Sequence, residues 1–340
     1  MSAEHKKILT VGGGSGLPTI NEALHHTNQF PHMDSIGAVF DSGGATGRRR
    51  IDAYGREVAH GDTLRVLGSL VHPDNRDAKY DVMQKWLKHR DTRDRVLGQD
   101  MLERFSSPDT GYEEIQKDWE TLGINFTGRL LPASTEPSHI VFTTGSGRQF
   151  NGEHNFDEER MSKDPVMNMV LSPEVQAFGP TADALSQAEL IVLSSGDLLP
   201  SVLANFLPGG MKEALAKSTA PMFLVTNLVS TRNVTHQFQP EDFVSIVEQY
   251  TGRRPDGLIV PEMSRGAFES RHPRVSSLYD LEHSHFLGWE DEALHDFQAN
   301  EGVRIVTHQA TDVVMKGPRG IVRHNPEKLA NALREILPTK

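Results

Sequence analysis

The sequence contains no cysteine among its 340 residues. It can therefore form no disulfide and no thiolate metal site, which is consistent with a reducing compartment. No run of about 18 apolar residues occurs, so the sequence predicts no membrane-spanning helix. The N-terminal stretch 1–7 also lacks the apolar core of a signal peptide. Together these absences predict a cytoplasmic protein.

Positive charge is scarce as well. The 35 Lys and Arg residues are outnumbered by 46 Asp and Glu, which gives a formal net charge of −11. This balance argues against a general nucleic-acid surface, so no nucleic-acid partner is expected. The 16 histidines show no spacing typical of metal ligands. The one basic cluster, Arg48–Arg50, is either a solvated helix face or a contact to phosphate.

Glycine, in contrast, is concentrated in the stretch Lys7–Leu17, KILTVGGGSGL. A short apolar run is followed at once by Ser15 and by four glycines, Gly12, Gly13, Gly14 and Gly16. A strand, a glycine turn and a helix form a phosphate-binding junction, because glycine leaves the backbone amides accessible. The helix N-terminus adds unpaired N–H donors and about half a positive charge.

The spacing of this loop limits what it can bind. G-G-G-S-G is tighter than the dinucleotide pattern G-x-G-x-x-G, and no Lys-Ser/Thr pair follows as in a P-loop. The sequence therefore establishes no NAD site. The alternative is a glycine-rich turn that only connects a strand to a helix.

A second glycine-rich loop follows the predicted strand 36–40 and contains Asp41, Ser42, Gly43 and Gly44. In a parallel sheet, the loops at the carboxyl ends of the strands line the ligand crevice. Asp41 would bind a ribose or a metal there, or else cap a turn. Asp62 is either the N-cap of a helix that runs to about Leu70 or a ligand of Mg²⁺ beside phosphates.

The order of the predicted elements indicates the fold class. Strands at 8–11, 36–40, 190–193 and 222–225 are each followed by a small-residue loop and a helix, and further strands are expected at 258–260 and 303–306. Residues 78–122 read as helical, about 128–171 as a β-rich insertion, and 264–300 as loop. We expect one α/β domain over residues 1–340, Rossmann-like and doubly wound, with a mainly parallel sheet and helices on both faces.

Several motifs in order resemble the YvcK/CofD family. They are VGGGSGL, FDSGGATGR and HGDTLRVL near the start, AELIVLSSGDLLPSVLANFLPGGMKEAL and APMFLVTNL in the middle, and RHNPEKLANAL at the end. The resemblance extends from about residue 7 to residue 337. The family includes gluconeogenesis factors and the 2-phospho-L-lactate transferase of deazaflavin cofactor synthesis.

The resemblance implies a nucleotide-linked small-molecule ligand. In the gluconeogenesis factor branch this is a UDP-sugar, and the role is regulation of carbon metabolism, cell-wall precursor supply and cell shape. In the transferase branch it is a GDP-linked donor, and the reaction depends on Mg²⁺. By position, the family's site residues correspond to Ser15, Asp41, Asp62, Asn205, Asn227 and Arg323, with Ser195 and Gly196 in a third small-residue loop.

The departures from the family pattern bear on the choice between these branches. Ser42 replaces the second Asp of D-D-G-G, and the segment Arg95–Gln99 lacks the family's His and Asn. One carboxylate in place of two favours binding without turnover over an Mg²⁺-dependent transferase. In either case Asp41 and Asp62 are the candidate Mg²⁺ ligands and, for a transferase, the candidate catalytic residues. No flavin site can be recognised, and the sequence leaves a homodimer open.

Overall fold

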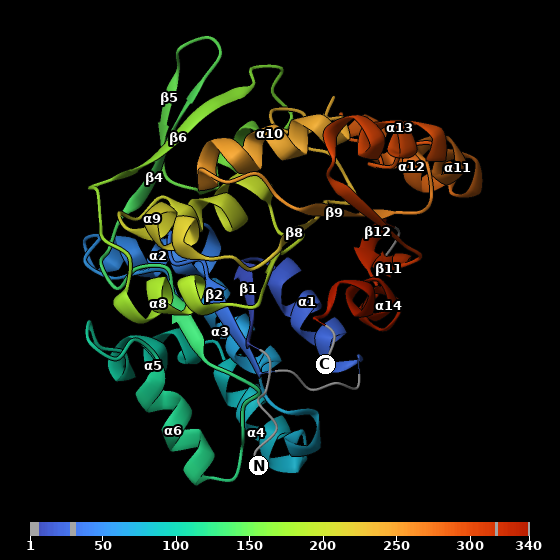
Figure 1. Ribbon diagram of the computed structural model, residues 1–340. Coiled ribbons are helices and arrows are strands. Elements are labelled where there is room, and N and C mark those ends of the chain that lie inside the picture. The colour runs from blue at the N-terminus through green and yellow to red at the C-terminus, as the bar shows by residue number, and fades with distance from the viewer. Residues whose placement is uncertain (1–6, 28–31, 317–318, 339–340) are drawn as a thin grey trace.

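A seven-stranded parallel sheet forms the centre of the computed structural model, which describes residues 7–27, 32–316 and 319–338 (Figure 1). The strand order is β10-β9-β8-β7-β1-β2-β3, and every neighbouring pair is parallel. The strands are β1 (Lys7–Gly12), β2 (His32–Gly37), β3 (Leu130–Pro132), β7 (Leu190–Leu193), β8 (Met222–Val225), β9 (Gly257–Pro261) and β10 (Arg304–His308). This is the Rossmann order with one strand added, and the order reverses between β1 and β7.

Helices cover both faces of the sheet, as β1 shows: Ile8 packs into one hydrophobic core, while Leu9 and Val11 pack into the other. The first core is covered by α1 (Gly16–His25), α3 (Gly61–Ser69), α6 (Glu113–Thr121) and α14 (Pro326–Ile336). The second is covered by α8 (Gly179–Gln187), η2 (Leu198–Val202), η3 (Leu203–Phe206), α9 (Met211–Lys217) and α10 (Pro240–Thr251). The predicted doubly wound α/β fold is therefore confirmed.

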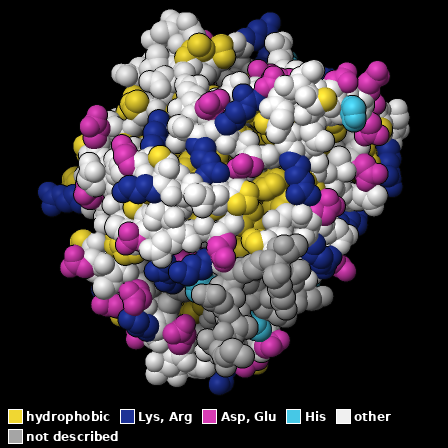
Figure 2. Space-filling model, in the orientation of Figure 1, with side chains coloured by type: hydrophobic (Ala, Val, Ile, Leu, Met, Phe, Trp, Pro, Cys, Tyr) yellow, Lys and Arg dark blue, Asp and Glu magenta, His cyan; other side chains and the backbone are white. Residues whose placement is uncertain are grey.

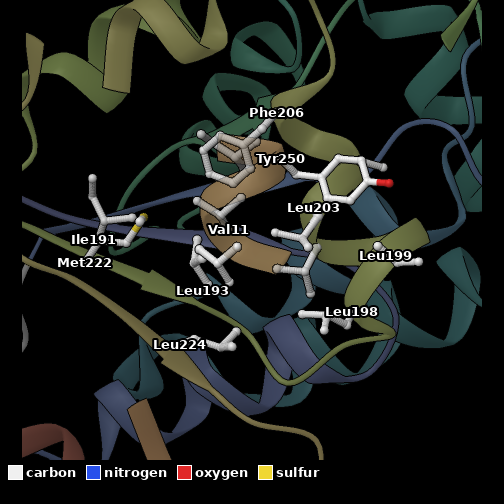
Figure 3. Close-up of a cluster of buried hydrophobic side chains, with 14 of the residues drawn as sticks. Val11, Ile191, Leu193, Leu198, Leu199, Leu203, Phe206, Met222, Leu224 and Tyr250 are labelled. Atoms are coloured by element: carbon white, nitrogen blue, oxygen red, sulfur yellow. The ribbon is translucent and has the colours of Figure 1, made fainter. Parts of the chain in front are cut away.

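The second core is built largely from consecutive apolar residues of the central strands. Figure 3 shows Val11 of β1 together with side chains of β7 and β8, packed against η2, η3 and α10. Strands buried on both faces take continuous runs of Val, Ile and Leu rather than an alternating pattern. Burial of these strands on both faces explains why they occur in the sequence as short, continuous apolar runs.

A separate three-stranded antiparallel sheet, in the order β5-β4-β6, projects from one end of the molecule (Figure 1, top left). It consists of β4 (His139–Thr144), β5 (Gln149–Asn151) and β6 (Val166–Ser172), with α7 (His154–Glu159) between β5 and β6. Residues 130–132, which the sequence analysis assigned to this insertion, instead pair with β2 in the parallel sheet. A three-residue strand carries no signal that distinguishes one sheet from another.

The predicted helical segment 78–122 consists of α4 (Ala78–Leu87), α5 (Leu97–Phe105) and α6, with a 3₁₀ turn before it at Pro73–Asn75. The loop after β2 leads into α2 (Gly44–Asp52). Among the residues that the structure describes, no helix is both long and apolar enough to cross a membrane. Figure 2 shows acidic and basic side chains interspersed over the visible face.

Two further predictions about the elements are wrong, and one sheet was not predicted. The second strand covers 32–37 rather than 36–40. Residues 264–300 are largely helical, with α11 (Arg265–Arg271), α12 (Pro273–Leu281) and α13 (Asp291–Glu301). A two-stranded sheet of β11 (Thr311–Lys316) and β12 (Arg319–His324) was not expected. The helices α11–α13 bury only one or two residues each, so their sequences lack a clear apolar periodicity.

Leu193 tests the central packing, because its side chain is fully buried between β1 and β8. We expect Leu193→Ala to lower the free energy of unfolding by about 2–5 kcal/mol, as deletion of a buried leucine leaves a cavity. Leu281→Ala is the control, since Leu281 is 74% exposed, and it should change stability by less than about 0.5 kcal/mol. Urea titrations followed by circular dichroism measure both, and equal effects would contradict this description of the core.

Candidate functional site

The loops at the carboxyl ends of β1, β7 and β8 enclose a cavity of about 670 Å³ at the point where the strand order reverses. Ligand pockets of about 300–1,000 Å³ are usual, and this is where open α/β sheets bind ligands. The predicted site residues that line it are Gly14, Ser15, Asp41, Gly43, Gly44, Asp62, Ser195, Gly196, Asn227 and Arg323. The predicted residues that do not line it are Gly12, Gly13, Gly16, Ser42 and Asn205.

The glycines of the first loop serve two different purposes. Gly14 lines the cavity with a φ of +61°, and a Cβ there would have only the Ser201 hydroxyl near it, at 3.9 Å. A Cβ at Gly13 would lie 2.3 Å from an Asp62 carboxylate oxygen, and one at Gly16 would lie 2.2 Å from the Gly196 nitrogen. Gly12, Gly13 and Gly16 therefore permit close packing of neighbouring loops, while Gly14 and Ser15 face the space available to a ligand.

Arg323 reaches the glycine loop from the other end of the chain. It lies on β12, and its Nη1 atom donates a hydrogen bond to the hydroxyl of Ser15 over 3.2 Å. Its side chain is exposed and forms no ion pair with a described carboxylate. The guanidinium therefore stands beside the glycine loop with most of its N–H donors unused, which suits it to contact an anionic group.

Asp62 is not the helix cap. His60 precedes the first residue of α3, and Asp62 lies inside the first turn, where its Oδ1 atom accepts from Arg65 over 2.5 Å. The Asp62 residue is 5% exposed. Burial, and to a lesser degree the charge of Asp41, raises the pKa of Asp62 to about 6.

Asp41 lines the cavity and also closes a turn, since its Oδ1 atom accepts from the Gly43 N–H over 2.7 Å. The second carboxylate beside it comes from Glu153, just before α7 in the insertion. Glu153 also accepts from the Ser42 N–H over 3.3 Å, and burial together with Asp41 raises the pKa of Glu153 well above its usual range. The sequence motifs did not indicate Glu153, because it is 111 residues away from Ser42.

Ser42 connects this loop to the insertion instead of facing the cavity. Its hydroxyl lies 2.9 Å from Nδ1 of His154 and accepts from the His154 N–H over 3.0 Å. The sequence allows two interpretations of the Arg48–Arg50 cluster, a phosphate contact or a solvated helix face. Arg50 does neither, because it is 2% exposed and donates to the backbone carbonyls of Phe40 and Asp41.

Two asparagines support the third loop. Asn227 lines the cavity and donates to the carbonyl oxygens of Ser195 and Gly196 over 3.3 and 2.7 Å. Asn205 is fully buried and donates to the carbonyls of Ser201 and Val202 in η2. The structure thus places Asn227 at the site and gives Asn205 a supporting role beneath it.

The cavity as a whole combines charges of both signs. Five carboxyl groups and four guanidinium groups line it, from Asp41, Asp62, Glu153, Asp157 and Asp197 and from Arg65, Arg90, Arg160 and Arg323. Burial, and then Asp157, raises the pKa of Asp197 to about 6. The segment that lacks the family's His and Asn still contributes Gln99, which donates to the Thr46 hydroxyl over 3.1 Å.

Comparisons with known proteins identify the family of this chain. A family model described as "2-phospho-L-lactate transferase CofD" matches residues 8–292. A putative gluconeogenesis factor of Deinococcus radiodurans is 27% identical over 97% of this chain, which spans 66% of that protein, just under two thirds. The gluconeogenesis factor of Listeria innocua is 25% identical, over 100% of this chain and 98% of that protein.

A solved structure supports the fold. The crystal structure of a UPF0052 family member from Bacillus halodurans has a TM-score of 0.78 and 22% sequence identity. The superposition covers 98% of this chain and 100% of that one.

The raised pKa of Asp62 gives a pH-dependent prediction. A carboxyl whose pKa rises from 3.8 to about 6 on folding binds its proton more tightly in the folded protein, so its ionisation destabilises the fold as pH increases. Asp62→Asn removes this cost. Between about pH 4 and pH 7 the difference in unfolding free energy should shift in favour of the variant by about 2 kcal/mol.

Urea titrations of the parent and of Asp62→Asn across this pH range measure the shift. Carboxyl groups that do not interact with Asp62 contribute equally to both proteins and cancel, whereas Asp41 is coupled to Asp62 and titrates with it. A difference that stays constant with pH would show that the Asp62 carboxyl titrates normally.

Proposed function

The chain belongs to the family described as 2-phospho-L-lactate transferase CofD, and we propose that it binds a UDP-sugar as a regulatory protein of the gluconeogenesis factor type. In this proposal it acts in the cytoplasm, as a monomer or a homodimer, and links carbon metabolism to cell-wall precursor supply and cell shape. The curated relatives named gluconeogenesis factors support the regulatory role. The identity of the nucleotide rests on the family resemblance.

The contact between Arg323 and Ser15 is the observation that carries the binding proposal. A diphosphate needs hydrogen-bond donors and positive charge, and the cavity offers both at the same place. Gly14 leaves the backbone accessible, the Ser15 hydroxyl is a donor, and Arg323 supplies a guanidinium that forms no ion pair with a described carboxylate. The nucleoside and sugar then extend through the rest of the cavity, where amide, hydroxyl and charged side chains such as Gln99 and Thr231 line the wall.

A transferase is the second candidate, and the position of Glu153 favours it. The missing second aspartate at Ser42 counted against catalysis, but Glu153 supplies a carboxyl group beside Asp41. When two acidic groups are buried side by side, they tend to share a proton, because two adjacent negative charges repel each other. Such a pair of carboxyl groups also provides the oxygen ligands that Mg²⁺ prefers.

The residues of the cavity fit Mg²⁺ only if phosphate groups of a ligand complete its coordination. The described residues contain no group of three or more His, Asp or Glu arranged to hold a metal by themselves. Mg²⁺ usually uses one or two carboxylates together with substrate phosphates. Asp41 with Glu153, or Asp41 with Asp62, would therefore hold the ion. When bound, it would neutralise charge on the phosphates during transfer of a phosphorus-containing group.

A thermal-shift panel tests the proposed ligand class directly. UDP-glucose, GDP and ADP-ribose are each added with and without Mg²⁺. A ligand present at about 100 times its Kd should stabilise the protein by about 2.7 kcal/mol. We expect UDP-glucose to give the largest shift, and a protein that none of the three stabilises would contradict the proposal.

Arg323→Gln should weaken binding of UDP-glucose by roughly 10- to 100-fold, because a hydrogen bond to a charged group contributes about 1.5–3 kcal/mol. Isothermal titration calorimetry measures the Kd. Arg254→Gln is the matched control, since Arg254 pairs with Glu301 on the surface and does not line the cavity. An unchanged Kd in Arg323→Gln would remove Arg323 from the phosphate site.

Glu153→Gln distinguishes the two candidates. If Glu153 and Asp41 hold Mg²⁺, the increase in nucleotide affinity that Mg²⁺ causes should fall by about tenfold in the variant, while affinity without Mg²⁺ is kept. Glu158→Gln is the control, because Glu158 is an exposed residue of α7, the helix that Glu153 precedes, and does not line the cavity. If Mg²⁺ increases nucleotide affinity equally in the parent, Glu153→Gln and Glu158→Gln, Glu153 does not hold the ion, and only the binding function remains.

A further inference from the structure

A second cavity, of about 700 Å³, lies at the carboxyl ends of β9 and β10. It shares no lining residue with the first cavity. Polar residues from five elements line it. Glu262 and His308 lie at the ends of β9 and β10, Arg271 and His272 at the junction of α11 and α12, Thr311 on β11 and Lys328 in the first turn of α14.

Unused hydrogen-bond donors outnumber unused acceptors in this cavity. Both carboxylate oxygens of Asp312 are already occupied, one by the Lys328 ammonium and one by the Asn325 amide, each at 2.7 Å. Arg271 makes no hydrogen bond or ion pair with any residue that the structure describes. The Lys328 ammonium keeps donors to spare, whereas Glu262 is the one lining carboxylate without a side-chain partner in the described part of the chain.

Three buried polar atoms near the same wall also lack partners among the described residues. They are Nε2 of His308, Nε2 of His324 and the hydroxyl oxygen of Thr311, and the two imidazole rings are 5.0 Å apart. His308 is 3% exposed, and burial lowers the pKa of His308 to about 4, so the ring is neutral at physiological pH.

The tautomer of His308 follows from its other nitrogen. Nδ1 accepts from the Ala310 N–H over 3.0 Å, so the ring hydrogen is on Nε2 and has no acceptor. Buried polar groups in proteins are nearly always paired. His308 thus contributes a neutral imidazole to the cavity wall, with its Nε2 hydrogen covered beneath the surface.

We propose that this second cavity binds a small hydroxy compound that carries a phosphate or carboxylate group. The oxyanion contacts Arg271 and Lys328, and a hydroxyl group of the ligand donates to Glu262.

The two strands of the C-terminal hairpin line different cavities. Thr311 and Asp312 of β11 line the second cavity, and Asp312 lies opposite Arg323 in the register of the hairpin. Arg323 of β12 lines the first cavity and contacts the glycine loop. The proposed ligand therefore binds next to the first site but shares no contact residue with it.

Calorimetric titrations of the full chain with inorganic phosphate, citrate and glucose 6-phosphate test the proposal. Glucose 6-phosphate and citrate represent the phosphate and carboxylate forms of the ligand, and inorganic phosphate lacks the hydroxyl group. We expect at least one of the two organic anions to bind more tightly than inorganic phosphate. Failure of all three to bind at millimolar concentration overturns the proposal.

Variants locate the binding. Arg271→Gln should weaken it by about tenfold, because it removes a charge-assisted contact. Arg274→Gln, an exposed arginine on α12 outside the cavity, should leave it unchanged, as should Arg323→Gln at the first site. If Arg323→Gln abolishes anion binding while Arg271→Gln retains it, the anion binds at the glycine loop, and the proposed second site is overturned. This outcome differs from failure of the first proposal, which the UDP-glucose titration measures separately.

Discussion

The direct backbone contact between the glycine loop and the loop after β7 is the constraint on which the site depends. β1 and β7 are paired neighbours, with Val11 opposite Leu193, so their following loops leave the sheet side by side. Any side chain at Gly16 would meet the Gly196 backbone at 2.2 Å and push the loops apart. A side chain at Gly13 would meet the carboxylate of Asp62 at 2.3 Å. The glycines therefore determine the width of the cavity as well as access to its amides.

The charges of the cavity are maintained at a cost in stability. Asp62, Glu153 and Asp197 all have pKa values raised mainly by burial, so a part of the folding free energy opposes their ionisation at neutral pH. A binding site can keep such groups when a ligand or cation completes it. The cost is consistent with a cavity shaped for an occupant rather than with a structural core.

Two segments far in sequence from the glycine loop complete the site. The insertion places Glu153 beside Asp41 and is held there by the contacts between Ser42 and His154. The C-terminal hairpin places Arg323 against Ser15, and its other strand lines the second cavity. Changes in either segment can thus reach the first site without altering the parallel sheet.

The sequence by itself determined the elements whose signals are local. Continuous apolar runs followed by small-residue loops indicated the parallel strands. The family motifs predicted that Asp41, Asp62 and Arg323 belong to the same ligand-binding site. Only the tertiary structure decided that Glu153 joins Asp41, that Gly13 and Gly16 serve packing, and that Arg50 is buried. Those roles depend on contacts between segments far apart in sequence, and no periodicity or spacing within a single stretch encodes them.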